Sequence, residues 1–156
     1  MSHGTLTLTK HHGLGNDFLV LLDTDDRYGA SHEAIAVALC DRRTGIGADG
    51  LIRLGPGLRM HLRNADGSPA EMSGNGIRCL AWVAASEGLA HDDRLVVDTG
   101  GGRREVLLEL TNGLVTSADV DMGPVSFDPA EIPLDAPSAF DLEATFHGVT
   151  YRGDAA

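Results

Sequence analysis

A glycine-rich loop runs directly into an apolar segment at residues 73–85, Ser73-Gly74-Asn75-Gly76-Ile77-Arg78-Cys79-Leu80-Ala81-Trp82-Val83-Ala84-Ala85. No charged residue occurs from Cys79 to Ala85, and a helix that is apolar on nearly every side is buried rather than laid on a surface. The two glycines at its start let the backbone approach a ligand closely. Unpaired N–H groups and the positive end of the helix dipole favour a carboxylate or phosphate there. The segment therefore predicts a buried central helix whose N-terminus is a binding site.

Runs of apolar and β-branched residues on both sides of this helix predict strands. A second helix is expected over 34–43, with Ser31 as its N-cap. Residues 11–17 are expected to form a loop, and Asn112-Gly113 to join two strands in a hairpin. The expected strands are 5–9, 18–22, 51–54, 58–63, 94–98, 105–110, 114–120 and 144–152. The pattern predicts an α/β fold of the α+β type, with a sheet wrapped around one long helix and the second helix outside.

The size and composition are those of an ordinary globular domain. The 156 residues, 42% of them hydrophobic and 22% charged, predict a single domain over 1–156. No run approaches the roughly 18 apolar residues that span a bilayer, and the N-terminus does not resemble a signal peptide. The two cysteines, Cys40 and Cys79, cannot form a disulfide framework, so we expect a cytoplasmic protein.

The formal net charge of −11 argues against nucleic acid as a partner, because such binding depends on neutralising phosphates. The basic residues gather in the first part of the chain, near the glycine-rich loops. A positively biased site on an acidic protein favours a small anionic or zwitterionic substrate. The charge pattern thus predicts a small-molecule partner.

Two familiar motifs are better explained without a cofactor or a metal. Residues 45–50, Gly-Ile-Gly-Ala-Asp-Gly, match the dinucleotide pattern G-x-G-x-x-G, which needs a strand before it and a helix after it. Here the expected order is the reverse, so we interpret these residues as turn glycines. Adjacent His11 and His12 rarely both bind one ion, and no ligand cluster follows at metal spacing. The sequence predicts neither an NAD site nor a metal site.

Amide side chains and one hydroxyl are the candidates for binding a substrate. Asn16 and Asn64 each close a junction between a strand and a loop, where either could instead hold an Asx turn. Together with Ser73, Gly74 and Asn75 they could orient a zwitterion without adding charge. Ser73 could also be merely the N-terminal cap of the helix, and it lacks an acidic or histidine partner at a fixed spacing.

Four motifs occur in one order along the chain. They are Lys10-x-His12-Gly13-Leu14-Gly15-Asn16-Asp17-Phe18, Arg43-x-Gly45-Ile46-Gly47-x-Asp49, Arg63-Asn64-Ala65-Asp66-Gly67 and Gly74-Asn75-Gly76-x-Arg78-Cys79. This set closely resembles the N-terminal half of the diaminopimelate epimerases, which are cofactor-independent enzymes of lysine and peptidoglycan-precursor synthesis. The resemblance runs along the whole chain and uses several independent motifs, but it covers only about half of the family's length.

The resemblance implies two pseudo-symmetric halves, each a curled, mostly antiparallel sheet around a central helix, with the substrate in the cleft between them. It also implies interconversion of LL- and meso-diaminopimelate by a two-base proton transfer, with one cysteine from each half on opposite sides of the α-carbon. No cofactor is implied. The helix N-termini would hold the α-carboxylate and stabilise the developing carbanion. By this resemblance Asn16 and Asn64 match substrate-binding amides, and Gly74 with Asn75 matches the carboxylate-binding loop.

Two departures from the family pattern change these expectations. Ser73 occupies the position of the catalytic cysteine, and its hydroxyl is a poor base beside a thiol, whose pKa is about 8.5. Cys79 is no substitute, because it lies six residues further along and inside the helix. The half that should bring the other cysteine is absent, so we expect this chain alone to be inactive. The expected partners are an amino-acid substrate, the missing half and a second copy in a homodimer.

Two alternative functions stay open at this point. A hydroxyl in place of one thiol suits a one-sided reaction in the same fold, such as the elimination catalysed by a hydroxy-amino-acid dehydratase. The chain could instead be a non-catalytic domain that binds small carboxylates, or a protein partner, through the glycine-rich N-terminus of its helix.

Overall fold

The computed structural model describes residues 5–90 and 92–156 of the chain. They form two compact units, of which the first ends at Met122 and the second runs from Gly123 to Ala156. The expectation that residues 1–156 form a single domain stays a prediction. Every candidate site residue lies in the first unit.

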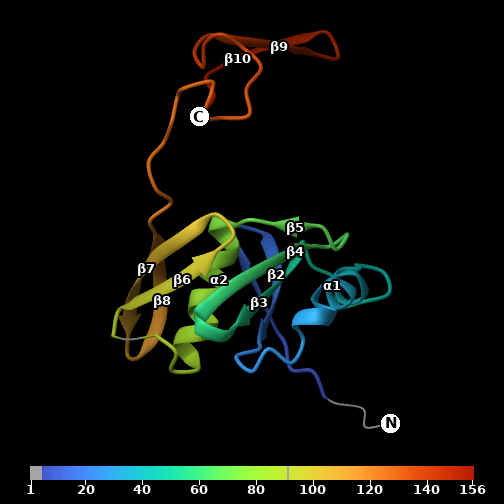
Figure 1. Cartoon of the computed structure of the whole chain (residues 1–156), viewed down its shortest axis with the longest axis vertical. Coiled ribbons are helices and arrows are strands. Elements are labelled where there is room, and N and C mark those ends of the chain that lie inside the picture. Colours follow the sequence, from blue (N-terminus) through green and yellow to red (C-terminus); the bar gives the residue numbers. More distant parts are fainter. Residues whose placement is uncertain (1–4, 91) are drawn as a thin grey trace. The chain divides into compact units, whose positions relative to one another are not determined.

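The first unit is built on one eight-stranded sheet that curls around a helix (Figure 1). The strand order is β1-β2-β3-β4-β6-β7-β8, and the short β5 pairs with β4. Neighbours are antiparallel except for the pairs β2–β3 and β4–β6. This arrangement confirms the predicted α/β fold with a curled, mostly antiparallel sheet. The strands are β1 (Thr9–Gly13), β2 (Asn16–Leu22), β3 (Gly50–Gly55), β4 (Arg59–Asn64), β5 (Pro69–Ala70), β6 (Arg94–Thr99), β7 (Gly102–Thr111) and β8 (Leu114–Val120).

Helix α2 (Gly74–Ser86) lies inside the curl of the sheet and confirms the predicted central helix (Figure 1). Seven of its residues are buried, and Ile77 and Leu80 are 0% exposed. Burial of each such side chain contributes about 1.5–3 kcal/mol. A helix of 13 residues that contains two glycines has little stability of its own, so packing against the sheet holds it. The helix ends before Gly88, which adopts the left-handed conformation common after a helix C-terminus, with a φ of 72°.

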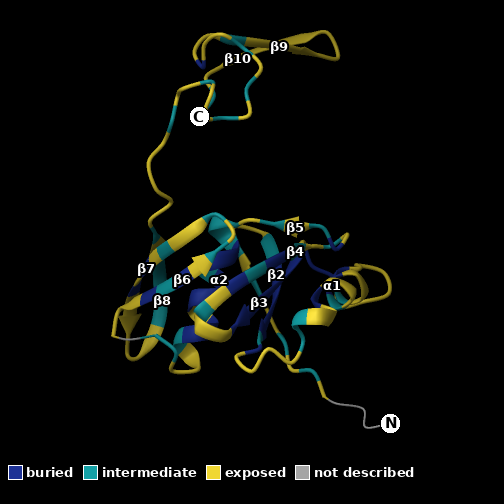
Figure 2. Ribbon diagram, viewed as in Figure 1, coloured by how far each residue is buried: buried dark blue, intermediate teal, exposed yellow. Residues whose placement is uncertain are grey.

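Strands β2 and β3 are buried on both faces because a helix covers each side of the sheet there (Figure 2). Val20 and Ile52 belong to the cluster around α2, whereas Leu19 and Leu51 belong to the cluster under the outer helix α1 (His32–Cys40). Strand side chains alternate between the two faces. Neither face of these strands meets water, which explains the continuous apolar run over 18–22 in β2. In β3 the apolar run is interrupted by the buried Arg53.

Helix α1 covers 32–40 rather than the predicted 34–43. Ser31 occupies the predicted N-cap position, but its side chain makes no cap hydrogen bond. A short 3-10 turn, η1 (Gly29–Ser31), precedes it, and a second one, η2 (Pro56–Leu58), joins β3 to β4. Oδ1 of Asp41 accepts the backbone N–H groups of Arg43 at 2.8 Å and Thr44 at 2.6 Å, which turns the chain out of the helix. No helix within 5–90 and 92–156 has the length and apolar character that crossing a membrane requires.

The first hairpin differs from the sequence expectation. Strand β1 covers 9–13 rather than 5–9, so most of the expected loop over 11–17 is strand. Only Leu14 and Gly15 form the turn, with φ of 54° and 89°, and they connect the paired residues Gly13 and Asn16. A leucine in the left-handed region is uncommon, so the tight two-residue turn was not recognisable as one. Its consequence is that Asn16 occupies the first position of β2.

The second unit contains a hairpin where a single strand over 144–152 was predicted. Strands β9 (Leu142–Phe146) and β10 (Val149–Gly153) pair in antiparallel register, and His147 with Gly148 forms the turn, with φ of 49° and 79°. The prediction of a single strand is therefore wrong. The turn was overlooked in the sequence because His-Gly is a weaker turn signal than Asn-Gly. The Asn112-Gly113 turn, with φ of 54° and 79°, joins β7 and β8 as predicted.

Candidate active site at the N-terminus of helix α2

A hollow of about 390 Å³ opens at the N-terminus of α2, where the sequence predicts a binding site. The first turn of the helix forms one side, and β8 with the residues after it forms the other. A Cβ on Gly74 would lie 3.6 Å from the sulfur of Met122, which is an ordinary van der Waals contact, so space alone does not require glycine at the first helical position. The hollow is lined by Ser73, Gly74, Asn75, Arg78, Ala118, Asp119, Val120 and Met122.

Ser73 caps α2 at this hollow. Its Oγ accepts the N–H of Gly76 at 3.0 Å, and its carbonyl oxygen accepts the N–H of Ile77 at 2.8 Å. Within the described ranges no hydrogen bond uses the amides of Gly74 and Asn75, so both are available at the positive end of the helix dipole. The cap reading of Ser73 is therefore correct, and its hydroxyl also lines the hollow with its own proton available to donate.

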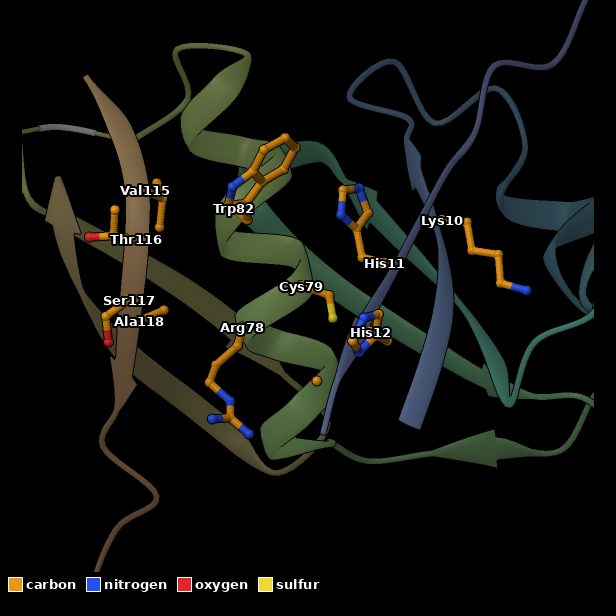
Figure 3. Close-up of a pocket in the computed structure, with 11 residues that line it drawn as sticks. Lys10, His11, His12, Arg78, Cys79, Trp82, Val115, Thr116, Ser117 and Ala118 are labelled. Carbon is orange, nitrogen blue, oxygen red and sulfur yellow. The ribbon is translucent and has the colours of Figure 1, made fainter. Parts of the chain in front are cut away.

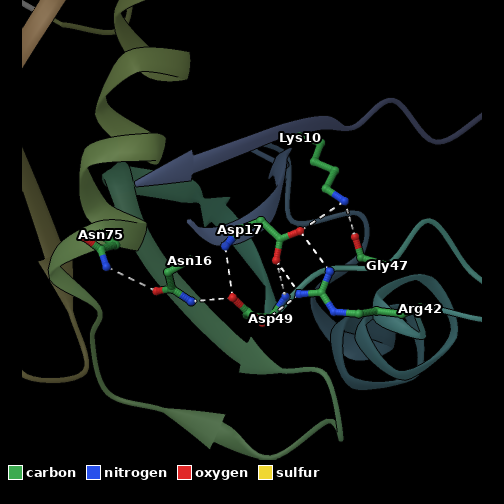
Figure 4. A network of polar contacts seen from close by, with 7 residues as sticks. All are labelled: Lys10, Asn16, Asp17, Arg42, Gly47, Asp49 and Asn75. Carbon is green, nitrogen blue, oxygen red and sulfur yellow. Dashed lines mark hydrogen bonds and ion pairs between the residues drawn. The ribbon is translucent and has the colours of Figure 1, made fainter. Parts of the chain in front are cut away.

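Asn16 lies beside Asn75, 59 residues further along the chain (Figure 4). Oδ1 of Asn16 is 3.5 Å from Nδ2 of Asn75. Arg78 donates to Oδ1 of Asn75 and, at 3.2 Å, to the carbonyl oxygen of Gly74. The fold thus brings together two of the amides that the sequence analysis singled out and fixes one of them from within α2.

Charged residues behind Asn16 form one connected network (Figure 4). Oδ2 of Asp49 accepts from Nδ2 of Asn16 at 2.7 Å and from the backbone N–H of Asp17 at 3.0 Å. Arg42 bridges the two carboxylates, at 2.6 Å from Oδ1 of Asp17 and 2.8 Å from Oδ1 of Asp49. Lys10 joins the network at 3.1 Å from Asp17. Three separate loops and strands are therefore tied together directly behind the hollow.

Both carboxylates of this network are ionised at neutral pH. The hydrogen bonds from the Arg42 guanidinium hold the pKa of Asp17 well below its usual range. The hydrogen bond from the Asn16 amide is the largest cause of the lowered pKa of Asp49. An ionised carboxylate can only accept hydrogen bonds, so Asp49 dictates which end of the Asn16 amide faces it.

Asn64 holds a turn and does not join the other candidates directly. Its Nδ2 donates to Oγ of Ser68 at 3.0 Å, and its backbone N–H donates to the carbonyl oxygen of Ser68 at 2.9 Å. The register of Asn64 with Gly50, and of Gly50 with Phe18, places it at the same end of the sheet as Asn16. The contacts of Asn64 are therefore those of a residue that holds a turn, which was one of the two roles considered for it from the sequence.

Sequence reasoning missed Asp17, Asp49 and Arg42 as supports of the site. Asp17 and Asp49 were visible inside the quoted motifs, but a carboxylate beside glycines reads as a turn residue. The quoted motif begins at Arg43, whereas the residue that donates to Asp17 and Asp49 in the structure is the preceding Arg42. Residue spacing alone does not tell which of two adjacent arginines faces the carboxylates, because the direction of each side chain depends on the residue at which helix α1 ends.

A second hollow of about 500 Å³ lies along α2 and contains His11, Cys79 and Trp82 (Figure 3). The rings of His11 and Trp82 have centroids 5.0 Å apart. Burial lowers the pKa of His11 and raises the pKa of the Cys79 thiol, so both favour their neutral forms. Among the described residues no three histidine, cysteine, aspartate or glutamate side chains are placed to hold a metal ion. Cys79 is therefore a buried core residue whose thiol is protonated.

The family model described as Diaminopimelate epimerase matches residues 8–127 of this chain. The diaminopimelate epimerase of Caldanaerobacter subterraneus is 39% identical over 94% of this chain and 55% of its own length. That of Moorella thermoacetica is 39% identical over 92% of this chain and 54% of its own length. The chain therefore spans about half the length of the curated relatives that it matches.

Solved structures share the fold at low sequence identity. A hydroxyproline epimerase from Agrobacterium vitis, with bound trans-4-hydroxy-L-proline, has a TM-score of 0.65 at 16% identity, covering 94% of this chain and 47% of that one. A probable proline racemase from Agrobacterium radiobacter K84 has a TM-score of 0.66 at 15% identity, covering 96% and 48%. These likenesses support the curled-sheet fold of the present chain.

Proposed function

The chain belongs to the diaminopimelate epimerase family, and on that premise we propose that it supplies one half of an active site that interconverts LL- and meso-diaminopimelate. The second half, which the relatives carry beyond the matched region, would form the opposite wall of the cleft. Localisation in the cytoplasm and assembly into a homodimer stay predictions.

The N-terminus of α2 is the observation that supports this proposal most strongly. Its two available amides, on Gly74 and Asn75, open onto the hollow that Ser73 also lines. In the proposed complex they bind the α-carboxylate, and they stabilise the charge that spreads onto it when the α-carbon loses its proton. Each pre-oriented donor of this kind contributes about 10²–10³ in rate. Asn16 and Asn64 are proposed to contact the rest of the substrate from the end of the sheet.

The proposed reaction moves one proton on and one proton off the α-carbon. A base on one side removes the α-hydrogen as a proton, and its bonding electrons stay on the carbon as a carboxylate-stabilised carbanion. An acid on the opposite side then returns a proton and inverts the configuration. Ser73 is proposed to lie on one of these two sides, and a residue of the second half on the other. Its free hydroxyl proton makes Ser73 better suited to donate than to abstract.

One half alone is expected to be inactive. Positioning the α-carbon between two groups and excluding water both require two walls. At the hollow, the N-terminus of α2 and Ser73 can contact the α-carbon and its carboxylate from one side. The group that must face the α-carbon from the opposite side would come from the second half. The lone chain is therefore expected to leave the α-hydrogen in place.

The proposal is tested by α-hydrogen exchange in deuterated water. This chain is mixed with the half of the Moorella thermoacetica enzyme that it does not cover, which gives what we call the complemented protein. We expect ¹H NMR to show loss of the α-proton signal of diaminopimelate and formation of its stereoisomer, and no loss with the lone chain. Exchange by the lone chain, or none by the complemented protein even with Ser73→Cys, would contradict the proposal.

The comparisons do not favour the two alternatives. The relatives carry an epimerase description rather than that of a dehydratase or a binding domain. The same spectra separate these functions, since elimination would yield an unsaturated product, and a binding domain would leave the substrate unchanged.

A further inference from the structure

We propose that Asp49 is a positioning residue that fixes the side-chain amide of Asn16, so that its Oδ1 accepts a hydrogen bond from a protonated amino group of the substrate. The inference rests on the proposed function and adds the polarity with which this half recognises its substrate. It assigns no catalytic step to Asp49, which lies behind Asn16 in the network of Figure 4.

The orientation of the Asn16 amide follows from the chemistry of its neighbour. Oδ2 of Asp49 lies 2.7 Å from one end of the amide, and an ionised carboxylate can only accept. The NH₂ end of Asn16 must therefore face Asp49, and the carbonyl oxygen must face away. Asp49 is itself held by Arg42 at 2.8 Å and by the backbone N–H of Asp17 at 3.0 Å. The amide has one stable orientation as long as these three contacts persist.

Asn75 is fixed in the complementary sense. Arg78 has only N–H donors, and it donates to Oδ1 of Asn75. The NH₂ group of Asn75 must then point toward Asn16, where it lies 3.5 Å from Oδ1. That distance is at the limit of a hydrogen bond, so the two amides hold each other weakly. Each retains capacity for another partner, an acceptor on Asn16 and a donor on Asn75.

A zwitterionic amino acid matches this pair. Its carboxylate suits the N–H donors of Asn75 and the α2 N-terminus, and its ammonium group suits the carbonyl oxygen of Asn16. A hydrogen bond from a charged donor contributes more than one from a neutral hydroxyl, by about tenfold in affinity. The site should therefore prefer an amino acid to the hydroxy acid of the same shape, and the preference should depend on Asp49.

The test is a pair of calorimetric titrations on the complemented protein, with diaminopimelate and with 2,6-dihydroxypimelate. We expect the unchanged protein to prefer diaminopimelate and Asp49→Asn to reduce that preference by about tenfold. The reason is that the side-chain oxygen of Asn at this position would accept from Arg42, as Oδ1 of Asp49 does, so its NH₂ group would replace Oδ2 and face Asn16. The backbone N–H of Asp17 loses its acceptor in this variant. Asn16 would then rotate and present its own NH₂ group to the ammonium.

Two further variants separate positioning from general damage to the network. Asp17→Asn removes a carboxylate from Arg42 without touching the Asn16 side chain, so it should leave the ratio of the two affinities unchanged. The double variant Asn16→Asp with Asp49→Asn restores an acceptor toward the substrate and should recover most of the preference. The inference is overturned if Asp49→Asn keeps the original ratio, or if Asp17→Asn changes the ratio as much.

Failure of this inference is distinguishable from failure of the proposed function. Both titrations measure binding and need no turnover. Exchange of the α-hydrogen with an unchanged affinity ratio in Asp49→Asn contradicts only the role of Asp49. A changed ratio without exchange contradicts only the proposed reaction, and no binding of either compound contradicts both.

Discussion

Replacing Ser73 with cysteine is expected to raise α-hydrogen exchange by the complemented protein by about 10²–10⁴-fold, the usual contribution of a matched acid–base group. The hydroxyl of Ser73 accepts the N–H of Gly76 at 3.0 Å and sits at the positive end of α2. A thiol at a helix N-terminus loses its proton more readily than in solution, where its pKa is about 8.5. The variant should thus gain a base where the unchanged chain has only a weak acid.

Ser73→Ala provides the matched control for this gain. It removes the acid–base group and the cap together, and it should cost about 1 kcal/mol of stability and lower exchange below that of the unchanged protein. Urea unfolding of each variant separates the two effects. Equal exchange rates for Ser73→Cys and Ser73→Ala, with both chains folded, would contradict the placement of proton transfer at this position.

Replacing Arg53 with methionine is expected to destabilise the chain by about 3–5 kcal/mol, because it leaves a buried carboxylate without its cation. Nη1 of Arg53 lies 2.9 Å from Oδ2 of Asp23 and 2.6 Å from Oδ1 of Asp26. The Arg53 and Asp23 side chains are 6% and 2% exposed. Asp23 also accepts the backbone N–H groups of Arg27 at 2.8 Å and Tyr28 at 3.0 Å. The pair therefore orders the connection between β2 and α1.

Arg94→Met is the matched control, since it makes the same change in an exposed pair. Arg94 lies 2.6 Å from Glu105, but the two side chains are 63% and 45% exposed, and the expected loss is under about 1 kcal/mol. Denaturant unfolding at neutral pH measures both. Equal losses for the two variants would mean that Arg53 contributes no more than a surface charge.

The pH dependence of this loss has a definite sign. Burial raises the pKa of Asp23, but hydrogen bonds from the Tyr28 amide, Arg53 and the Arg27 amide outweigh it, and the pKa is lowered overall. A lowered carboxyl pKa gives stability that is present above the pKa of the unfolded chain and is lost as the pH falls. Removing Arg53 weakens that contribution. The difference between the variant and the unchanged chain should therefore be largest near pH 7 and shrink in acid.

Local patterns predicted the central architecture, and long-range packing decided what they missed. The apolar run after Gly76 could only be a buried helix, and Asn112-Gly113 could only be a tight turn. The turns at Leu14 and His147 carry a weaker signal than Asn-Gly, because a left-handed conformation in these residues is imposed by the strands on either side. The end of α1 depended on one side chain, Asp41, whose bonds to the following amides are invisible to periodicity.

The site was predictable in its parts but not in its connections. Ser73, Gly74 and Asn75 follow from the start of one helix, which is local information. The meeting of Asn16 with Asn75 depends on the curl of the sheet around α2, and the support from Asp49 and Arg42 depends on how the loop between α1 and β3 folds back onto β2. Asn64 shows the converse, since it lies at the same end of the sheet as Asn16 but bonds to its own turn.

The central claim is that the N-terminus of α2 receives the substrate carboxylate, and amide chemical shifts test it most directly. Only this chain is labelled with ¹⁵N in the complemented protein, and diaminopimelate is added. We predict that the largest changes in chemical shift occur at the amides of Gly74 and Asn75. The amide of Gly57 is the unaffected reference, because this glycine lies in a turn and a Cβ built on it would have no atom within 4 Å. Shifts at Gly74 and Asn75 no larger than that at Gly57 would contradict the claim.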